Sequence, residues 1–184
     1  DYLRMFMHAE SQVGQPPLKD GDLYGFIRIG SDFTSNYYEY RVPMKITQPG
    51  TTDPVQIWPT ANNFAIVLND LLSAKIQRDS KGIPLYVPYQ TTDVNGNIIV
   101  VVGNPNIGDA KNMMLGVLNP KKTDQTPGDD GLPKCVEVWY NELRMAGTND
   151  KQGYAAAGKV ALQLADLGNV NLSGGMHTQG YGNI

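Results

Sequence analysis

The chain has 184 residues, of which 41% are hydrophobic, and a formal net charge of −3. This length is enough for one domain with a sizeable core and a small appendage. The acidic balance, with an isoelectric point of about 5.3, argues against nucleic acids and anionic membrane surfaces as partners, because both select a basic face. The 20 glycines, 12 prolines and 10 tyrosines favour short strands joined by tight turns.

The sequence shows no signal peptide, no apolar run long enough for a membrane helix and no initiator methionine. It opens directly on a strand-like segment, so we expect a fragment of a longer protein. The single cysteine, Cys135, has no partner for an internal disulfide. Its simplest interpretation is a small buried hydrophobe on a strand.

The first part of the chain predicts strands. Apolar and polar side chains alternate along residues 2–9, which is typical of a half-buried strand. Two more strands are expected over residues 23–30 and 36–44. Within the second of these, Pro43 indicates a sheet edge or a strand end, because proline cannot donate to the strand ladder.

The middle of the chain mixes one helix with further strands. A strand over residues 64–68 precedes a short helix over residues 71–78, which Asn69 and Asp70 can cap. Two prolines break the next strand-like segment, and an Asn-Gly turn signal follows. The proline-broken segment covers residues 83–89 and the turn signal residues 93–97. Two strands are expected after them, over residues 98–102 and 113–118. Residues 121–133 are expected to form a polar loop.

A longer strand is expected over residues 135–145. Its apolar side chains share one face from Val136 to Tyr140, but Leu143 falls on the opposite face. Either a β-bulge follows Asn141, or Glu142 points inward and needs a buried partner. We favour the bulge.

These elements amount to roughly eight short strands and at most one short helix. The spacing and turn chemistry predict an all-β protein, in which residues 1–147 form an antiparallel β-sandwich of the jelly-roll, galactose-binding-like type. Residues 148–184 differ. There, two alternating segments rich in alanine and glycine flank a short turn over residues 166–169, which predicts a β-hairpin. The pattern fits a hairpin of an outer-membrane barrel in the parent protein, or an ordinary hairpin packed on the sandwich.

Few residues suggest a metal or cofactor site. His8 and His177 are far apart and each stands alone on a strand, and zinc at Cys135 would need further soft ligands. The segment from Asp93 resembles the start of a calcium loop, but its twelfth position is Asn104 instead of a bidentate glutamate, so we favour a hairpin turn. We therefore predict no metal and no cofactor.

Catalytic groups are equally scarce. Asp129 and Asp130 lie in a polar loop, whereas Glu137 and Glu142 lie five positions apart on one strand. Neither pair predicts an acid/base couple, and no phosphate-binding glycine loop is present. We predict no catalytic residue and no enzymatic activity.

Aromatic residues are the one suggestive feature for a ligand. Together they could form a sugar-stacking platform on a jelly roll, which would make the chain a carbohydrate-binding module of a cell-surface protein. The alternative is packing in the core and at its rim, the usual position of aromatic side chains on half-buried strands. The residues are Tyr37, Tyr38, Tyr40, Trp58 and Trp139.

An ordered set of short motifs resembles the SprA (Sov) family, the giant outer-membrane translocons of the type 9 secretion system of Bacteroidetes, which are linked to gliding motility. Each motif is weak alone, but their number and order cover nearly the whole chain. The motifs are Leu18–Asp22, Phe26–Thr34, Asn36–Tyr40, Gly103–Asn106, Glu137–Arg144 and Ala165–Val170.

The resemblance implies a non-enzymatic part of a protein-conducting machine in the outer membrane, on its periplasmic or its extracellular side. Partners in the family include other parts of the parent barrel, secreted cargo, the shuttle barrel PorV and a periplasmic plug protein. On this hypothesis residues 1–147 are an extramembrane domain. The isolated hairpin would then pair with a second copy, fold onto the sandwich or be disordered.

Overall fold

The structure is a computed structural model that describes residues 1–121, 130–147 and 154–178. The chain forms two compact units, Asp1–Gly147 and Thr148–Ile184. Both are built from antiparallel sheets, and the only helix longer than one turn among the described residues has 13 residues. The prediction of an all-β, sandwich-like fold with a short helix and a C-terminal hairpin is therefore confirmed.

A five-stranded antiparallel sheet forms one layer of the first unit, with the strand order β5-β6-β3-β2-β7. The predicted strands are present within a residue or two of their expected bounds, and Pro43 ends a strand as expected. One strand was not predicted with these bounds: β5 begins at Tyr89, whereas the sequence placed a strand-like segment, broken by two prolines, over residues 83–89. The strands are β2 (Tyr24–Gly30), β3 (Tyr37–Pro43), β5 (Tyr89–Thr92), β6 (Ile98–Val102) and β7 (Asn112–Leu118).

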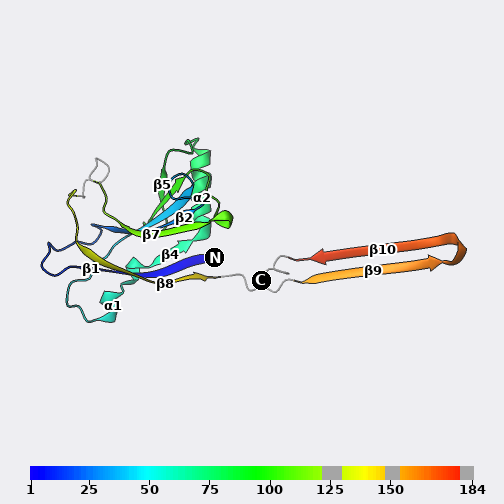
Figure 1. Cartoon of the computed structure of the whole chain (residues 1–184), viewed down its shortest axis with the longest axis horizontal. Helices are drawn as coiled ribbons and strands as arrows, with labels where there is room; N and C mark the ends of the chain where they lie inside the picture. Colours follow the sequence, from blue (N-terminus) through cyan, green and yellow to red (C-terminus); the bar gives the residue numbers. More distant parts are fainter. Residues whose placement is uncertain (122–129, 148–153, 179–184) are drawn as a thin grey trace. The chain divides into compact units, whose positions relative to one another are not determined.

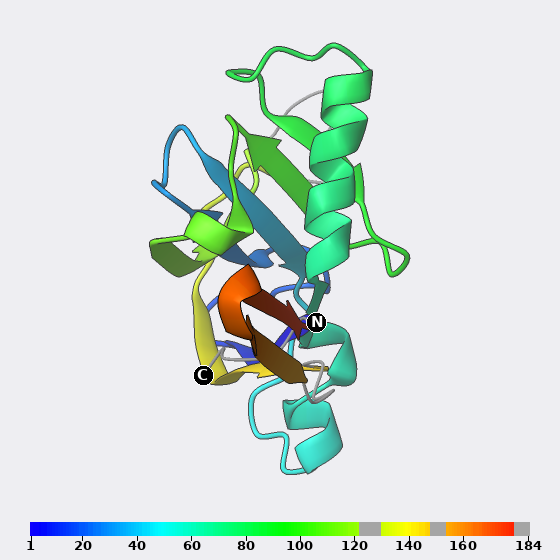
Figure 2. The same ribbon diagram turned by 90° about the vertical axis from the view of Figure 1, so that its right-hand side faces the viewer.

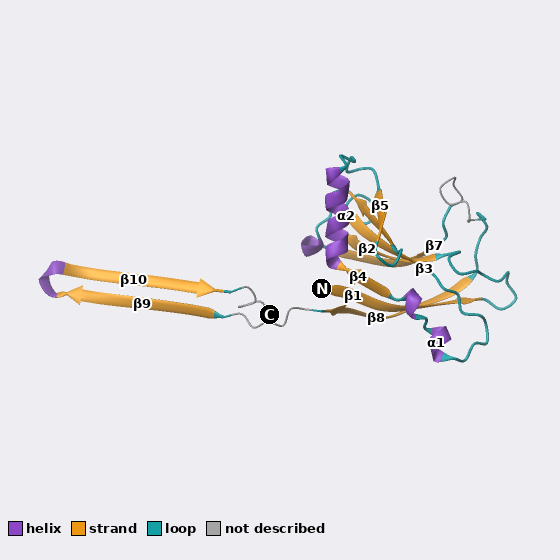
Figure 3. Cartoon of the chain, turned by 180° about the vertical axis from the view of Figure 1, so that it is seen from behind, coloured by secondary structure: helices purple, strands orange, loops and turns teal. Residues whose placement is uncertain are grey.

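A three-stranded sheet with the order β4-β1-β8 packs on the first (Figure 3). The central strand of this sheet alternates apolar and polar residues, and its apolar side chains point inward against the buried face of the five-stranded sheet. Such burial is the main stabilising contribution to the unit, at roughly 25 cal/mol per Å² of apolar surface. The strands are β1 (Tyr2–Ser11), β4 (Phe64–Val67) and β8 (Val136–Ala146), and the core includes Leu3, Met5, Met7, Ala9, Ile27, Tyr38, Tyr40, Val42, Phe64, Ile66, Ile99 and Val101.

Helix α2 (Leu68–Ser80) completes the second layer. It follows β4 without a loop and packs against β5 and β6 of the larger sheet (Figure 2). The helix begins three residues earlier than predicted and has no side-chain cap. Instead, the Leu68 amide donates to the Asp1 carbonyl at 3.2 Å, and Asp70 in the first turn favours the positive end of the helix dipole.

Short helical turns connect the strands. Helix α1 (Pro54–Ile57) was not predicted, although its start carries a recognisable signal: the Asp53 carboxylate accepts the Val55 amide at 3.0 Å, with proline in the first turn. The 3₁₀ turns Thr60–Asn62 and Ile107–Asp109 are also present.

The predicted β-bulge in β8 is confirmed. Phe6 of β1 pairs with Asn141 and Arg4 pairs with Arg144, so two residues of β8 oppose one residue of β1. Glu142 adopts a φ of 56°, the left-handed conformation that lets the strand take up the extra residue. The bulge leaves Glu142 exposed, so no buried partner is needed.

The second unit is a β-hairpin (Figure 1). Strands β9 (Ala155–Leu164) and β10 (Gly168–His177) have ten residues each. They are antiparallel in continuous register and joined by the turn Ala165–Leu167.

Candidate functional site

The calcium-like segment is a turn between β5 and β6. The Asp93 amide donates to the Asn97 carbonyl at 2.9 Å, and the Asp93 carboxylate accepts bonds from Tyr40, Asn97 and the Asn95 amide. Burial raises the pKa of Asp93, but these hydrogen bonds outweigh it and hold the pKa below its usual value. Asn104, the twelfth position, lies beyond the other end of β6. The carboxylate oxygens are therefore occupied by the chain itself.

The histidines and the cysteine are dispersed. His8 lies on β1, where its Nδ1 is 2.6 Å from the Ile57 carbonyl and its ring packs against Trp58, whereas His177 ends β10 in the other unit. Cys135 is exposed just before β8, contrary to the buried position expected for it. Within the described ranges, no group of three histidine, cysteine or acidic side chains is placed to hold a metal ion.

The paired carboxylates do not assemble into a couple. Asp130 accepts a hydrogen bond from Lys134 at 2.6 Å, which is the main reason that the pKa of this carboxyl is lowered, and Asp129 lies outside the described residues. Glu137 accepts the Trp139 indole N–H at 2.7 Å, and Glu142 lies in the bulge. Each described carboxylate thus has its own local role.

The five aromatic residues occupy separate parts of the sandwich. Tyr38 and Tyr40 are buried in the core. Tyr37 lies on the other face of β3, with the Arg28 guanidinium 4.0 Å from its ring centroid. Trp58 and Trp139 both flank His8, the first by ring contact and the second as its cross-strand partner. The structure therefore brings the two tryptophans to the same histidine, and the five-residue platform is not formed; packing in the core, the alternative, holds for Tyr38 and Tyr40.

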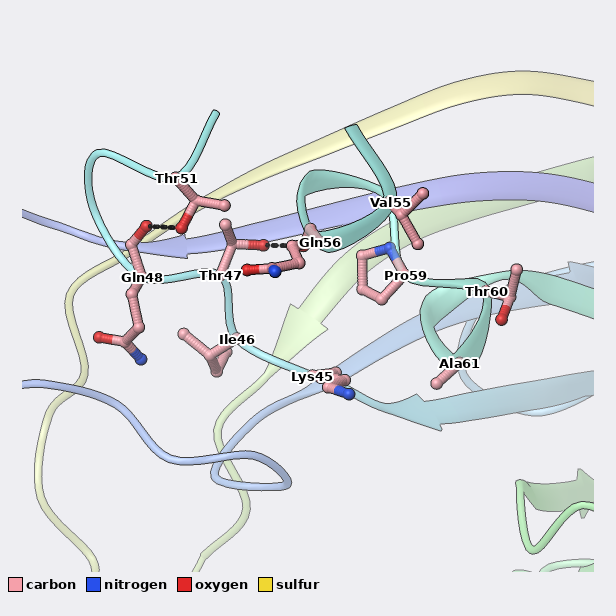
Figure 4. Close-up of a pocket in the computed structure, with 10 residues that line it drawn as sticks. All are labelled: Lys45, Ile46, Thr47, Gln48, Thr51, Val55, Gln56, Pro59, Thr60 and Ala61. Carbon is pink, nitrogen blue, oxygen red and sulfur yellow. Dashed lines mark hydrogen bonds between the residues drawn. The ribbon is translucent and has the colours of Figure 1, made fainter. Parts of the chain in front are cut away.

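A cavity of about 550 Å³ lies between the segment after β3 and the α1 region (Figure 4). Its walls are held by the hydrogen bonds from Thr47 to the Gln56 carbonyl and from Thr51 to the Gln48 carbonyl. Among the described residues that line it, Lys45 is the only one with an ionisable side chain, and the others offer neutral hydrogen-bonding groups without an acid/base pair. The sequence analysis did not predict this cavity, because it did not predict the fold of the chain between residues 45 and 61 that encloses it.

The hairpin carries a more distinctive surface. Cross-strand partners share a face, so Val160 with Leu172 and Leu162 with Val170 form an apolar face, while Lys159 with Ser173 lies on the polar one. These four side chains remain between 41% and 62% exposed. Ten-residue strands with one wholly apolar face are typical of strands that contact lipid.

The comparison with protein families matches the whole length of the given sequence. A sequence model of the SprA_N family, described as a motility related/secretion protein, covers residues 1–184. The chain belongs to this family. The resemblance read from the ordered motifs is thereby confirmed, and SprA_N membership makes the chain a motility- or secretion-related protein. No curated protein matches it.

The described part of this SprA_N chain contains no helix with the length and hydropathy needed to cross a membrane.

Proposed function

We propose that the chain is a non-enzymatic, extramembrane β-sandwich of the type 9 secretion translocon of the outer membrane, followed by a hairpin that supplies two strands to the barrel of the parent protein. The family match supports a role in secretion and motility. The observation that carries the finer proposal is the exposed apolar face of β9 and β10.

The dimensions of the hairpin agree with this proposal. Each strand has ten residues, which span about 33 Å at roughly 3.3 Å per residue. At a tilt of about 45°, this length crosses about 23 Å, close to the apolar band of roughly 25 Å in outer-membrane barrels. The polar face, with Lys159, Gln163 and Asn171, would then line the interior.

The sandwich would act as a scaffold outside the membrane, and its proposed partners are secreted cargo, the PorV shuttle barrel and the periplasmic plug protein. The carbohydrate-binding alternative loses its main support, because Tyr38 and Tyr40 are in the core and Tyr37 lies on the opposite side of the sandwich from Trp139.

Two neighbouring substitutions in the parent protein test the hairpin. Val160→Lys places a charge in the middle of the apolar face, at a cost of about 2–4 kcal/mol at the membrane midplane, whereas Ala161→Lys places it on the polar face. We expect Val160→Lys to reduce the amount of parent protein folded in the outer-membrane fraction and to reduce cargo export, while Ala161→Lys leaves both nearly unchanged. Equal tolerance of the two would contradict membrane insertion.

Deleting residues 1–147 from the parent tests the sandwich. We expect the shortened protein to remain in the outer-membrane fraction and to export no cargo. Normal export by a stable deletion protein would overturn the scaffold role.

A further inference from the structure

The β-bulge has a chemical consequence on the outer face of the smaller sheet. Without the extra residue, Arg4 would oppose Leu143; with it, Arg4 directly opposes Arg144. Like charges in direct cross-strand positions repel each other. Bulges often re-aim a side chain toward a binding site, so the arginine pair indicates an anionic partner.

The two guanidinium groups are poorly neutralised. Within the described residues, the acid nearest to Arg144 is Glu142 at 3.9 Å, and both side chains are 55% exposed, so this contact is weak. Arg4 makes no ion pair with any described residue; it packs over the Tyr2 ring, 5.6 Å from its centroid. Both arginines keep donors free for a ligand.

The other sheet shows what a neutralised pair looks like in this protein. Arg28 and Arg41 also approach each other, but buried Glu39 lies between them and is 2.5 Å from a nitrogen of each. No acid of the described chain lies between Arg4 and Arg144 in this way, and these two arginines border a hollow instead.

This hollow has a volume of about 140 Å³ and is bordered by both arginines. Phe6 and Ala65 give it apolar walls, with the Arg144 guanidinium 5.8 Å from the Phe6 ring centroid. The small side chain of Ala65, the other cross-strand neighbour of Arg4, leaves this space open. Its size suits one short side chain.

Asn63 indicates that the ligand also donates a hydrogen bond. It lines the same hollow, and its Oδ1 atom is buried without a hydrogen-bond partner in the structure, which is costly for a polar atom. A deprotonated carboxylate alone has no hydrogen to donate to this oxygen and phosphate has only an O–H, whereas a peptide offers a carboxylate to the arginines and a main-chain N–H to Asn63. The exposed arginine side chains, by turning toward the carboxylate, would open the way to this oxygen.

We propose that the hollow between Arg4 and Arg144 binds an acidic side chain of a partner peptide segment, with the carboxylate held by the two guanidinium groups and a peptide N–H donated to Asn63. This site is on the sandwich and does not depend on insertion of the hairpin.

Arginine Nε–H NMR signals of the whole 184-residue chain, kept in mild detergent, test the site. The probes are N-acetyl-glutamate N-methylamide, which offers a carboxylate and peptide N–H groups, then acetate and inorganic phosphate. We expect the Arg4 and Arg144 signals to shift and saturate, while those of Arg28 and Arg41 stay in place. The peptide-like probe should bind about fivefold more tightly than acetate, the value of one hydrogen bond.

Single substitutions measure how much each of these side chains contributes to binding of the probe. Arg4→Ala and Arg144→Ala should each weaken the peptide-like probe about tenfold, as expected for a charge-assisted hydrogen bond. Asn63→Ala should remove the advantage over acetate, and Lys19→Ala, an exposed cation elsewhere on the sandwich, should change nothing. Unmoved Arg4 and Arg144 signals, equally large shifts of the Arg28 and Arg41 signals, or phosphate binding as tightly as the peptide-like probe would overturn the proposal.

Discussion

The Tyr140 hydroxyl donates a 2.6 Å hydrogen bond to the Gly116 carbonyl and so connects β8 of one sheet to β7 of the other. The ring packs against Phe64, at a centroid distance of 6.1 Å, and against the core. One residue therefore joins the edges of the two layers by both apolar and polar contacts.

We expect Tyr140→Phe to lower the free energy of unfolding by about 1–2 kcal/mol, because the ring stays and the Gly116 carbonyl loses its donor. Urea unfolding followed by tryptophan fluorescence measures the change. Tyr86→Phe is the matched control, since Tyr86 is 82% exposed. Equal effects of the two substitutions would show that the bond between the sheets is not stabilising.

Stability should fall in alkaline solution. Burial raises the pKa of both Tyr40 and Tyr140 well above the usual value of 10.0, and for Tyr40 the hydrogen bond to Asp93 raises it further. Below pH 10 these hydroxyls are neutral in both states; above it the unfolded chain ionises first, so stability is lost as the pH rises. Urea midpoints measured on both sides of pH 10 test this. The double variant Tyr40→Phe, Tyr140→Phe should show a smaller decline, and a flat profile in the unsubstituted chain would contradict the prediction.

Gly30→Ala should be strongly destabilising, by roughly 2–3 kcal/mol or more. A Cβ atom at this position would lie 2.1 Å from the Asn36 carbonyl oxygen and 2.7 Å from the Tyr37 Cα, which are main-chain atoms of the adjacent strand and its turn. Gly108→Ala is the control, since a Cβ atom at Gly108 would lie 3.5 Å from its nearest neighbour, the Asn106 Oδ1 atom, which is an ordinary contact distance. Thermal unfolding compares the two, and similar melting temperatures would refute the steric argument.

Arg4→Gln should stabilise the ligand-free chain by about 0.2–1 kcal/mol, because it removes a like charge opposite Arg144. The gain should shrink at high salt, where exposed charges are screened. Unfolding curves at low and high salt, with Lys19→Gln as control, measure it. A loss of stability at low salt would indicate that the two charges do not repel in the folded chain.

Local periodicity in the sequence was enough to locate most strands and their buried faces. The alternation along residues 2–9 predicts the strand β1, and the same two-residue period predicts the two faces of the hairpin. The shift of apolar phase after Asn141 predicts the bulge. Each of these inferences works because side chains on a strand alternate between faces over a few residues.

Other features required the tertiary structure. The position of α2 beside the smaller sheet and the distribution of the aromatic residues over three places each depend on which distant segments become neighbours. Arg4 and Arg144 illustrate the difference. The sequence predicts the bulge, but only the pairing of β1 with β8 places these two charges opposite each other, because strand pairing joins residues far apart in the chain and leaves no trace in local periodicity.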